Sequence, residues 1–185
     1  GIGYLVDIQG NDKYFSKHFS QGAGIMGIGG IMDISGDDIY DAHTFCQGAG
    51  MFGLGFIFDS SGKDLYDCAT NGQGSATTLG FGIVSDLEGD DTYQLAINNT
   101  KDTLQSRPGY GQGGAISSRP WPVTKKLTHY GGVGILTDYS GNDTYNTLGW
   151  CDQGGSYIMS LGALVDYDGN DNYSNNRGGG SSIHV

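Results

Sequence analysis

The chain has 185 residues, of which 35 are Gly and 3 are Pro, and its 20 acidic and 9 basic residues give a net charge of −11. This length suits one domain with a moderate core, and the charge argues against nucleic acid or an anionic membrane as a partner, because both require a basic surface. No run of 18 apolar residues occurs, so we predict no membrane span.

A unit of the form D-x-x-G-x-D-x-Y recurs from the start of the chain to its end. Its copies occupy residues 7–14, 33–40, 59–66, 86–93, 138–145 and 166–173. The second Asp advances by 26, 26, 27, 52 and 28 residues. Because 52 is twice 26, we interpret the long step as two units, one of which has lost its Asp turn.

Apolar and glycine positions keep the same phase in every copy. An aliphatic residue stands two positions before each first Asp, at Leu5, Ile31, Ile57, Val84, Leu136 and Leu164. A glycine stands four positions before it, at Gly3, Gly29, Gly55, Gly82, Gly134 and Gly162. This glycine column indicates either positive φ or an approach of two backbones too close for a Cβ atom.

Short runs rich in β-branched and aromatic residues, broken by Gly-x-Asp turns, favour strands over helices. A unit of about 26 residues buries its apolar face only by stacking on its neighbours. We therefore predict an all-β fold, a parallel β-solenoid or β-helix of about seven coils of ~26 residues, with equivalent positions ~4.8 Å apart. A Gln-Gly pair follows the Tyr at Gln21, Gln47, Gln73 and Gln153, and Gln112 has the appearance of a displaced member.

Two columns of carboxylates follow from in-register stacking. Their members are Asp7, Asp12, Asp33, Asp38, Asp59, Asp64, Asp86, Asp91, Asp138, Asp143, Asp166 and Asp171. At about 5 Å and an effective dielectric constant near 20, each neighbouring pair costs roughly 3 kcal/mol before screening. Three arrangements would relieve this: hydrogen bonds from turn amides, Ca²⁺ between the coils, or coils that are out of register.

Half of each turn resembles a known motif. The segments Gly10-Asn11-Asp12-Lys13-Tyr14 and Gly141-Asn142-Asp143-Thr144-Tyr145 are similar to the second half of the nonapeptide G-G-x-G-x-D-x-U-x of the RTX family. That family forms calcium-binding β-rolls in secreted bacterial proteins. The unit here is longer, and an Asp three residues before the Gly replaces the leading Gly-Gly. The resemblance implies a secreted or cell-surface bacterial protein that binds Ca²⁺.

The region 98–129 interrupts the repeat. Its extra residues carry five candidates for a binding loop, namely Arg107, Arg119, Trp121, Lys125 and Lys126. Insertions in solenoids form loops on one face, and loops often carry recognition. We expect this loop to bind a glycan, an acidic partner or a second copy, or only to cover a gap where the Asp turn is missing.

Other sequence features give weaker indications of a function. Gly22 to Gly27 fits G-x-G-x-x-G, but the motif recurs with the coil and no helix is expected after it, so no nucleotide cofactor is predicted. The Asp pairs could serve as a glycosidase acid and base, although a repeated pair is more often scaffold than catalyst. Cys46, Cys68 and Cys151 form no CxxC, and we expect buried free thiols. Regular Thr columns, needed to bind ice, are absent.

The sequence thus favours one solenoid domain over residues 1–185, cut from a longer extracellular or cell-surface repeat protein. We expect a structural or adhesive module stabilised by Ca²⁺, which associates with itself through its ends or with the rest of a longer chain. The alternative is a carbohydrate-binding or carbohydrate-cleaving β-helix. An enzyme is the less favoured outcome, and no catalytic residue is named.

Overall fold

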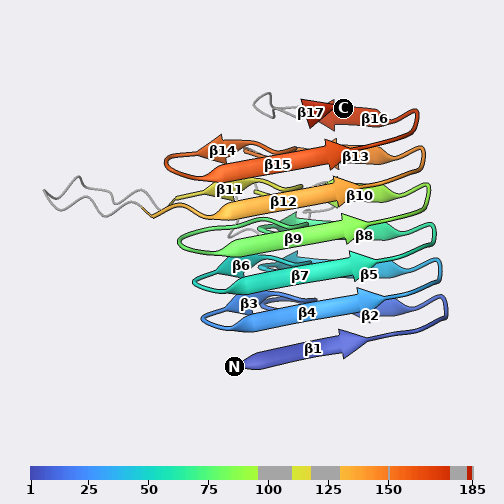
Figure 1. The fold of residues 1–185 in the computed structure, drawn as a ribbon, viewed down its shortest axis with the longest axis horizontal. Coiled ribbons are helices and arrows are strands. Elements are labelled where there is room, and N and C mark those ends of the chain that lie inside the picture. The colour runs from blue at the N-terminus through green and yellow to red at the C-terminus, as the bar shows by residue number, and fades with distance from the viewer. Residues whose placement is uncertain (96–109, 118–129, 150, 176–182, 185) are drawn as a thin grey trace, which may run out of the picture.

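The computed structural model describes residues 1–95, 110–117, 130–149, 151–175 and 183–184, and these contain strands and turns but no helix. Successive coils stack from the N-terminus at one end to the C-terminus at the other (Figure 1). The predicted parallel β-solenoid is confirmed. No helix in the described part of the chain has the length and apolar character of a membrane span.

Each coil contributes a strand to two extended sheets. The seven-stranded sheet contains β1 (Ile2–Val6), β4 (Ile28–Asp33), β7 (Leu54–Asp59), β9 (Phe81–Asp86), β12 (Val133–Asp138), β15 (Leu161–Asp166) and β17 (Ile183–His184). The six-stranded sheet contains β2 (Lys13–Phe15), β5 (Ile39–Thr44), β8 (Leu65–Thr70), β10 (Thr92–Leu95), β13 (Thr144–Thr147) and β16 (Asn172–Asn175). All the pairings are parallel, as stacking of equivalent positions requires.

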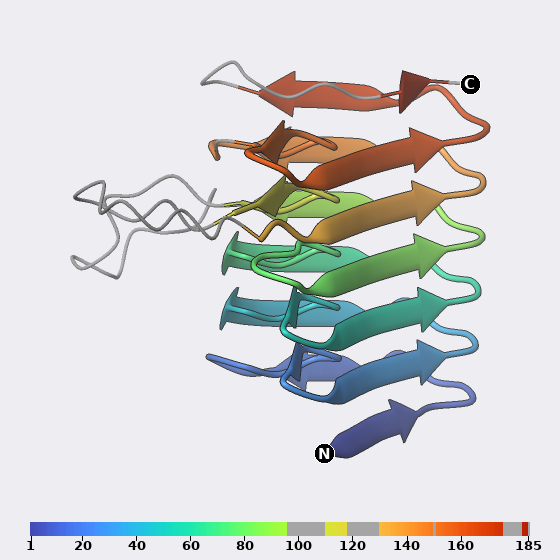
Figure 2. The ribbon, with the colours of Figure 1, turned by 60° about the vertical axis from the view of Figure 1, so that its left-hand side comes forward.

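A third row of short strands lies behind the seven-stranded sheet (Figure 2). It consists of β3 (Gly24–Ile25), β6 (Gly50–Met51), β11 (Ala115–Ile116) and β14 (Ser156–Tyr157). Single bridges from Gly50 to Ala76 and from Ala76 to Ala115 join its two halves into one row. Each coil therefore has three sides, of which two are full strands.

The interpretation of the 52-residue step was wrong. Strand β9 pairs directly with β12, and β10 pairs directly with β13, so Asp86 lies beside Asp138 in the register. The step is therefore a single coil with additional residues, and no Asp turn is missing between the paired strands. The solenoid accordingly has about five turns rather than about seven.

The core is narrow and half polar. The aliphatic column and the repeat tyrosines form one buried cluster, in which Tyr40, Tyr66, Tyr93 and Tyr145 are fully buried. Successive tyrosine rings lie parallel with centroids 4.7–4.9 Å apart, which is the spacing of the coils. A second, smaller buried cluster contains Ala42, Cys46, Cys68 and Leu95, and the Asp and Gln columns add buried polar side chains. Packing of this core therefore depends on how its polar atoms are satisfied.

The glycine column is explained by close backbone approach rather than by positive φ. A Cβ atom on Gly55 would lie 2.2 Å from the Ala49 carbonyl oxygen, and one on Gly82 would lie 2.1 Å from that of Ser75. These carbonyls belong to the chain that follows the Gln-Gly pair. The seven-stranded sheet and the third row therefore touch backbone to backbone, with no layer of side chains between them.

The Gln-Gly pairs form tight turns. Gln47 and Gly48 have φ of 47° and 71°, and the Ala49 amide donates to the Cys46 carbonyl at 3.1 Å. Positive φ at both central residues is typical of a type I′ turn. The Gln47 side-chain amide donates to the carbonyls of Tyr40 in its own coil and Asp67 in the next. Gln112 makes the equivalent bonds, which confirms it as a displaced member of the set.

Candidate metal centre

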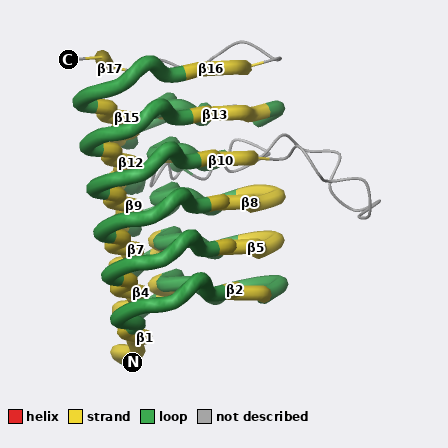
Figure 3. Tube along the Cα trace, turned by 90° about the vertical axis from the view of Figure 1, so that its right-hand side faces the viewer, coloured by secondary structure: helices red, strands yellow, loops and turns green. Residues whose placement is uncertain are grey.

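The two Asp columns face each other across one corner of the solenoid. The first Asp of a turn is the last residue of a strand in the seven-stranded sheet, as Asp59 is in β7. The second Asp directly precedes a strand of the six-stranded sheet, as Asp64 precedes β8. The turns stack along one edge of the molecule (Figure 3). Gly62 between the two columns has φ of 156°, and a Cβ atom there would lie 1.7 Å from the Gly36 carbonyl oxygen.

In four first-column carboxylates one oxygen accepts a hydrogen bond from the tyrosine of the preceding coil, whereas Asp166 Oδ2 accepts one from Tyr173 of its own turn. The Tyr40 hydroxyl donates to Asp59 Oδ2 at 2.6 Å, and the Tyr66 hydroxyl donates to Asp86 Oδ2 at 2.7 Å. Tyr14 and Tyr93 make the same bond. From Tyr14 to Tyr93 the repeat Tyr is thus both a ring in the stacked ladder and the hydroxyl donor to the next Asp turn.

One oxygen of each second-column carboxylate from Asp38 to Asp171 accepts a hydrogen bond from a backbone amide of the preceding coil. The Asp38 amide donates to Asp64 Oδ1 at 2.6 Å, and the Asp64 amide donates to Asp91 Oδ1 at 2.7 Å. The bond persists across the 52-residue step, because the Asp91 amide donates to Asp143 Oδ1 at 2.7 Å. The expected amide capping is therefore present, and it runs between coils.

The second oxygen of these carboxylates has no hydrogen-bond partner. Among the described residues this holds for Oδ1 of Asp33, Asp59, Asp86 and Asp138 and for Oδ2 of Asp38, Asp64, Asp91 and Asp143. All eight residues are at most 2 % exposed. An unsatisfied buried polar group costs about 1–3 kcal/mol, and more when it is charged. Hydrogen bonding within the protein therefore accounts for only half of the acceptors in the corner.

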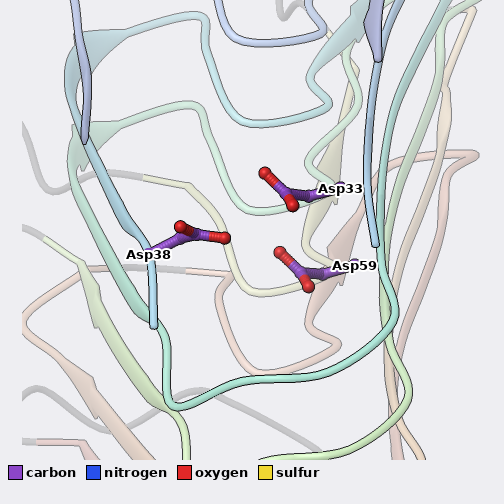
Figure 4. A group of neighbouring side chains, drawn as sticks. All are labelled: Asp33, Asp38 and Asp59. Carbon is purple, nitrogen blue, oxygen red and sulfur yellow. The ribbon is translucent and has the colours of Figure 1, made fainter. Parts of the chain in front are cut away.

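The carboxylates also converge on one another. Asp33, Asp38 and Asp59 offer oxygens that lie within 4.8 Å of one another, with Asp38 facing the other two (Figure 4). Three further groups have the same property: Asp59, Asp64 and Asp86; Asp91, Asp138 and Asp143; and Asp143, Asp166 and Asp171. Asp59 and Asp143 each belong to two groups, so the groups form a file along the solenoid. Asp7 and Asp12, in the first coil, belong to none of these groups.

Burial raises the pKa of several carboxyl groups of the file above the ordinary value near 3.9, and three of them are raised most. Desolvation and the neighbouring Asp59 raise the pKa of Asp64 to about 9. Desolvation and Asp86 raise the pKa of Asp91 to about 10, and desolvation and Asp143 raise that of Asp138 to about 9. For Asp86 the pKa rises only to about 6, because burial is opposed by hydrogen bonds, of which the bond from Tyr66 has the largest effect. Without a counterion, part of the file is protonated at neutral pH.

Two chemical states can satisfy the corner. In one, protons on some carboxyls bridge to unprotonated neighbours. In the other, hard cations replace those protons and take the free oxygens as ligands. Both remove the like-charge repulsion that a fully ionised file would suffer.

Three further predictions concern the binding loop, the Asp pairs considered as an acid and a base, and the glycine motif at Gly22 to Gly27. All five binding-loop residues (Arg107, Arg119, Trp121, Lys125 and Lys126) lie outside the residues that the structure describes. The pairs from Asp33 to Asp143 are buried too deeply for a glycosidic bond to reach them, which argues against the acid-base interpretation of those pairs. Gly22 to Gly27 is followed by strand β4 rather than a helix, as expected.

Sequence reasoning missed the two donor columns. The sequence places Tyr seven residues after each first Asp, and Gln seven or eight residues after four of those six tyrosines. This regular spacing was visible, but the direction of each bond, from one coil to the next, requires the register of the stack. Comparison of the chain with protein-family models, with curated proteins and with solved structures finds no match.

Proposed function

We propose that the chain is a structural or adhesive solenoid module whose Asp-lined corner holds a file of Ca²⁺ ions between successive coils. The observation that supports it most strongly is the set of eight buried carboxylate oxygens without a hydrogen-bond partner. Each of the eight carboxylates belongs to at least one of the four groups, which bring together oxygens from the same and the neighbouring coil. A cation at these positions would stabilise the stack by binding only the folded state.

The ligand set favours Ca²⁺ over Mg²⁺. Ca²⁺ takes six to eight oxygens from carboxylates and carbonyls in flexible geometry, whereas Mg²⁺ demands a near-octahedral shell and usually keeps several waters. Each group brings three carboxylates together with oxygens within 4.8 Å of one another, and the eight residues with an unpartnered oxygen are at most 2 % exposed. A site crowded with carboxylates and shielded from solvent suits the ion that gives up its waters more readily.

The similarity of each half-turn to the RTX motif supports the same ion and an extracellular or cell-surface location in a bacterium. Calcium is abundant outside cells, where a repeated low-affinity site is filled by mass action. Self-association through the solenoid ends, attachment to the rest of a longer chain, and glycan binding remain parts of this proposal. A carbohydrate-active β-helix is its alternative.

The proposal is tested by thermal unfolding of the protein after treatment with EDTA, and then with excess Ca²⁺ or Mg²⁺. We expect Ca²⁺ to raise the unfolding midpoint by several degrees and Mg²⁺ to raise it less. Asp64→Asn removes a carboxylate that belongs to the file and retains an oxygen to accept the Asp38 amide. It should abolish most of the calcium-dependent rise.

Asp37→Asn is the matched control, because Asp37 lies one residue before Asp38 and its carboxylate accepts the Lys63 amide on the exterior of the turn. This variant should respond to Ca²⁺ like the parent. Equal midpoints of the parent in EDTA and in Ca²⁺ would overturn the cation proposal and leave the protonated file as the state of the corner.

A further inference from the structure

A second polar feature of the interior lies beside the Gln-Gly turns, away from the Asp file. Two positions meet there in each coil: the second residue after the repeat Tyr and the residue before the repeat Gln. In the first coil they are Ser16 and Ser20, whose hydroxyls hydrogen-bond at 2.6 Å. In a later coil they are Thr147 and Asp152, which also hydrogen-bond. The two positions therefore adjoin within these coils, and the coils between them carry other residues there.

The two central cysteines occupy these positions in neighbouring coils. Cys46 precedes Gln47, and Cys68 follows Tyr66 by two residues on β8. Their Sγ atoms lie 2.9 Å apart, and both side chains are fully buried. A disulfide bond is about 2.04 Å long, so an inward movement of about 0.9 Å, shared by the two sulfurs, would join them.

The neighbouring residues leave room for this pair. A Cβ atom on Gly72 would lie 2.3 Å from Cys68 Sγ and 3.1 Å from Cys46 Sγ, so only glycine fits beside both sulfurs. Ala42, the register partner of Cys68, is likewise small. The contact thus combines two thiols with two minimal side chains, whereas the first coil has two hydroxyls.

We propose that Cys46 and Cys68 form a disulfide bond that fastens the second Asp-turn coil to the third. The sequence alone suggested no such bond, because the two residues hold different positions in the repeat. The bond would close a loop between residues 22 apart in sequence, and closing such a loop stabilises chiefly by restricting the unfolded chain. Cys151 is half-buried and lies in a later coil, so it stays a free thiol.

The chemistry requires an oxidant, for which a small disulfide such as oxidised glutathione suffices. One cysteine thiolate displaces one glutathione thiol and forms a mixed disulfide. The second cysteine thiolate then attacks the cysteine sulfur of that bond and releases the other glutathione thiol. Two protein thiols lose two electrons and two protons, and one glutathione disulfide gains them. Burial raises the pKa of the Cys46 thiol, so the bond forms most readily while the coils are stacking.

The test is to refold the reduced full chain with oxidised and reduced glutathione, and then to count thiols under denaturing conditions and map the peptides without reduction. We expect one remaining thiol, a Cys46–Cys68 linked peptide, and an unfolding midpoint roughly 5–10 °C above that of the reduced protein. Cys46→Ser should leave two thiols and no difference between oxidised and reduced protein, whereas Cys151→Ser should show the full rise. Three free thiols in the refolded native parent, or a link through Cys151, would overturn the proposal.

A separate observation concerns the exterior of the seven-stranded sheet. The outward positions of six of its strands carry no charged residue; they are Ile2, Tyr4, Val6, Ile28, Gly30, Met32, Leu54, Phe56, Phe58, Phe81, Ile83, Ser85, Val133, Ile135, Thr137, Leu161, Ala163 and Val165. Phe58 and Met32 are about two-fifths exposed (41 % and 39 %). The outward face of the six-stranded sheet differs, since it carries Lys13, Asp41 and Asp67 among its residues.

We infer that this apolar face binds the same face of a second copy. Six strands about 4.8 Å apart and up to six residues long cover roughly 29 by 20 Å, or about 580 Å² in plan. This lies at the upper end of the ~300–600 Å² found for the largest apolar patch on a typical monomer, and it approaches the ~800 Å² of accessible surface that each partner contributes to a stable interface. A second copy offers the same spacing of side-chain rows, and contact through a charge-free face keeps the acidic turns of the two copies apart.

Light scattering coupled to gel filtration tests this inference at several protein concentrations. We expect a dimer for the parent, a monomer for Ile83→Lys on the apolar face, and a dimer for Thr92→Lys on the opposite sheet, where the side chain has a similar, intermediate exposure. Circular dichroism checks that both variants keep the parent spectrum. A monomeric parent, or an Ile83→Lys variant that is folded and dimeric, would overturn it.

Discussion

The repeat tyrosine links stacking to electrostatics at the scale of a single residue. Its ring contributes to the ladder, and its hydroxyl is the hydrogen-bond donor to one oxygen of the next first-column carboxylate. Burial and the adjacent aspartates raise the pKa of Tyr66 well above its ordinary value, so the hydroxyl keeps its proton and remains a donor. The same bond holds the pKa of Asp86 lower than burial alone would set it.

Tyr66→Phe tests this pairing. The ring stack is kept, but Asp86 Oδ2 loses its donor, so we expect the free energy of unfolding to fall by about 1–3 kcal/mol and the pKa of Asp86 to rise further. Urea denaturation measures the first effect. Tyr139→Phe is the control, because Tyr139 is 44 % exposed and stacks on Tyr167 at the exterior. Equal losses in the two variants would contradict the role assigned to the buried hydroxyl.

At the scale of the element, the glycine column sets how closely a strand approaches the third row. Gly55→Ala adds a Cβ atom 2.2 Å from a backbone carbonyl oxygen, which cannot rotate away as a side chain could. We expect a loss of about 2–4 kcal/mol in the free energy of unfolding, because either the strand or the third row must shift.

Gly3→Ala is the matched control for this prediction. Gly3 occupies the same column in β1, pairs in register with Gly29, and would meet nothing within 4 Å of an added Cβ atom. Thermal unfolding of the two variants should differ by several degrees. If Gly55→Ala melts like Gly3→Ala, close backbone approach does not explain the column.

The strands, their register and the two Asp columns could all be predicted from the repeat, because stacking forces equivalent positions together. Residues such as Ile57 and Tyr66 are buried because of their phase within the repeat, and the structure follows that phase. The 52-residue step was misinterpreted because a spacing of twice the period does not distinguish a degenerate coil from a coil with insertions. Only the direct pairing of Tyr93 with Tyr145 distinguishes them.

The different bonding of the two oxygens of each carboxylate could not be predicted in the same way. The sequence offered amide capping and cation binding as alternatives, whereas Asp64 has one oxygen bound to an amide and the other free. The contact between Cys46 and Cys68 was also hidden, because it joins different phases of the repeat in adjacent coils. Both features depend on side-chain direction across coils, which periodicity does not encode.

At the scale of the whole molecule, the buried file makes stability depend on pH. Asp64, Asp91 and Asp138 have folded pKa values of about 9, 10 and 9, against about 3.9 in the unfolded chain. Between these limits the folded protein binds more protons than the unfolded protein. The contribution of these groups to stability is therefore fully present below pH 4. It is lost as the pH rises toward 9–10, and the free energy of unfolding falls by up to about 1.4 kcal/mol per pH unit for each group.

We accordingly expect the unfolding midpoint of the EDTA-treated protein to fall between pH 5 and pH 9. Excess Ca²⁺ should reduce this fall, because the ion replaces the protons that the carboxylates lose. Calorimetry at fixed ionic strength measures both curves, and magnesium at equal concentration controls for screening. A midpoint that rises with pH in EDTA would show that the folded carboxylates are ionised without a cation.

The location of bound calcium tests the central claim most directly. Crystals of the parent protein grown with Ca²⁺ should give anomalous difference peaks in a row along the Asp corner, each among the carboxylates of one group, such as Asp59, Asp64 and Asp86. Anomalous peaks confined to the exterior of the molecule, with the corner carboxyls hydrogen-bonded only to one another, would contradict a calcium file.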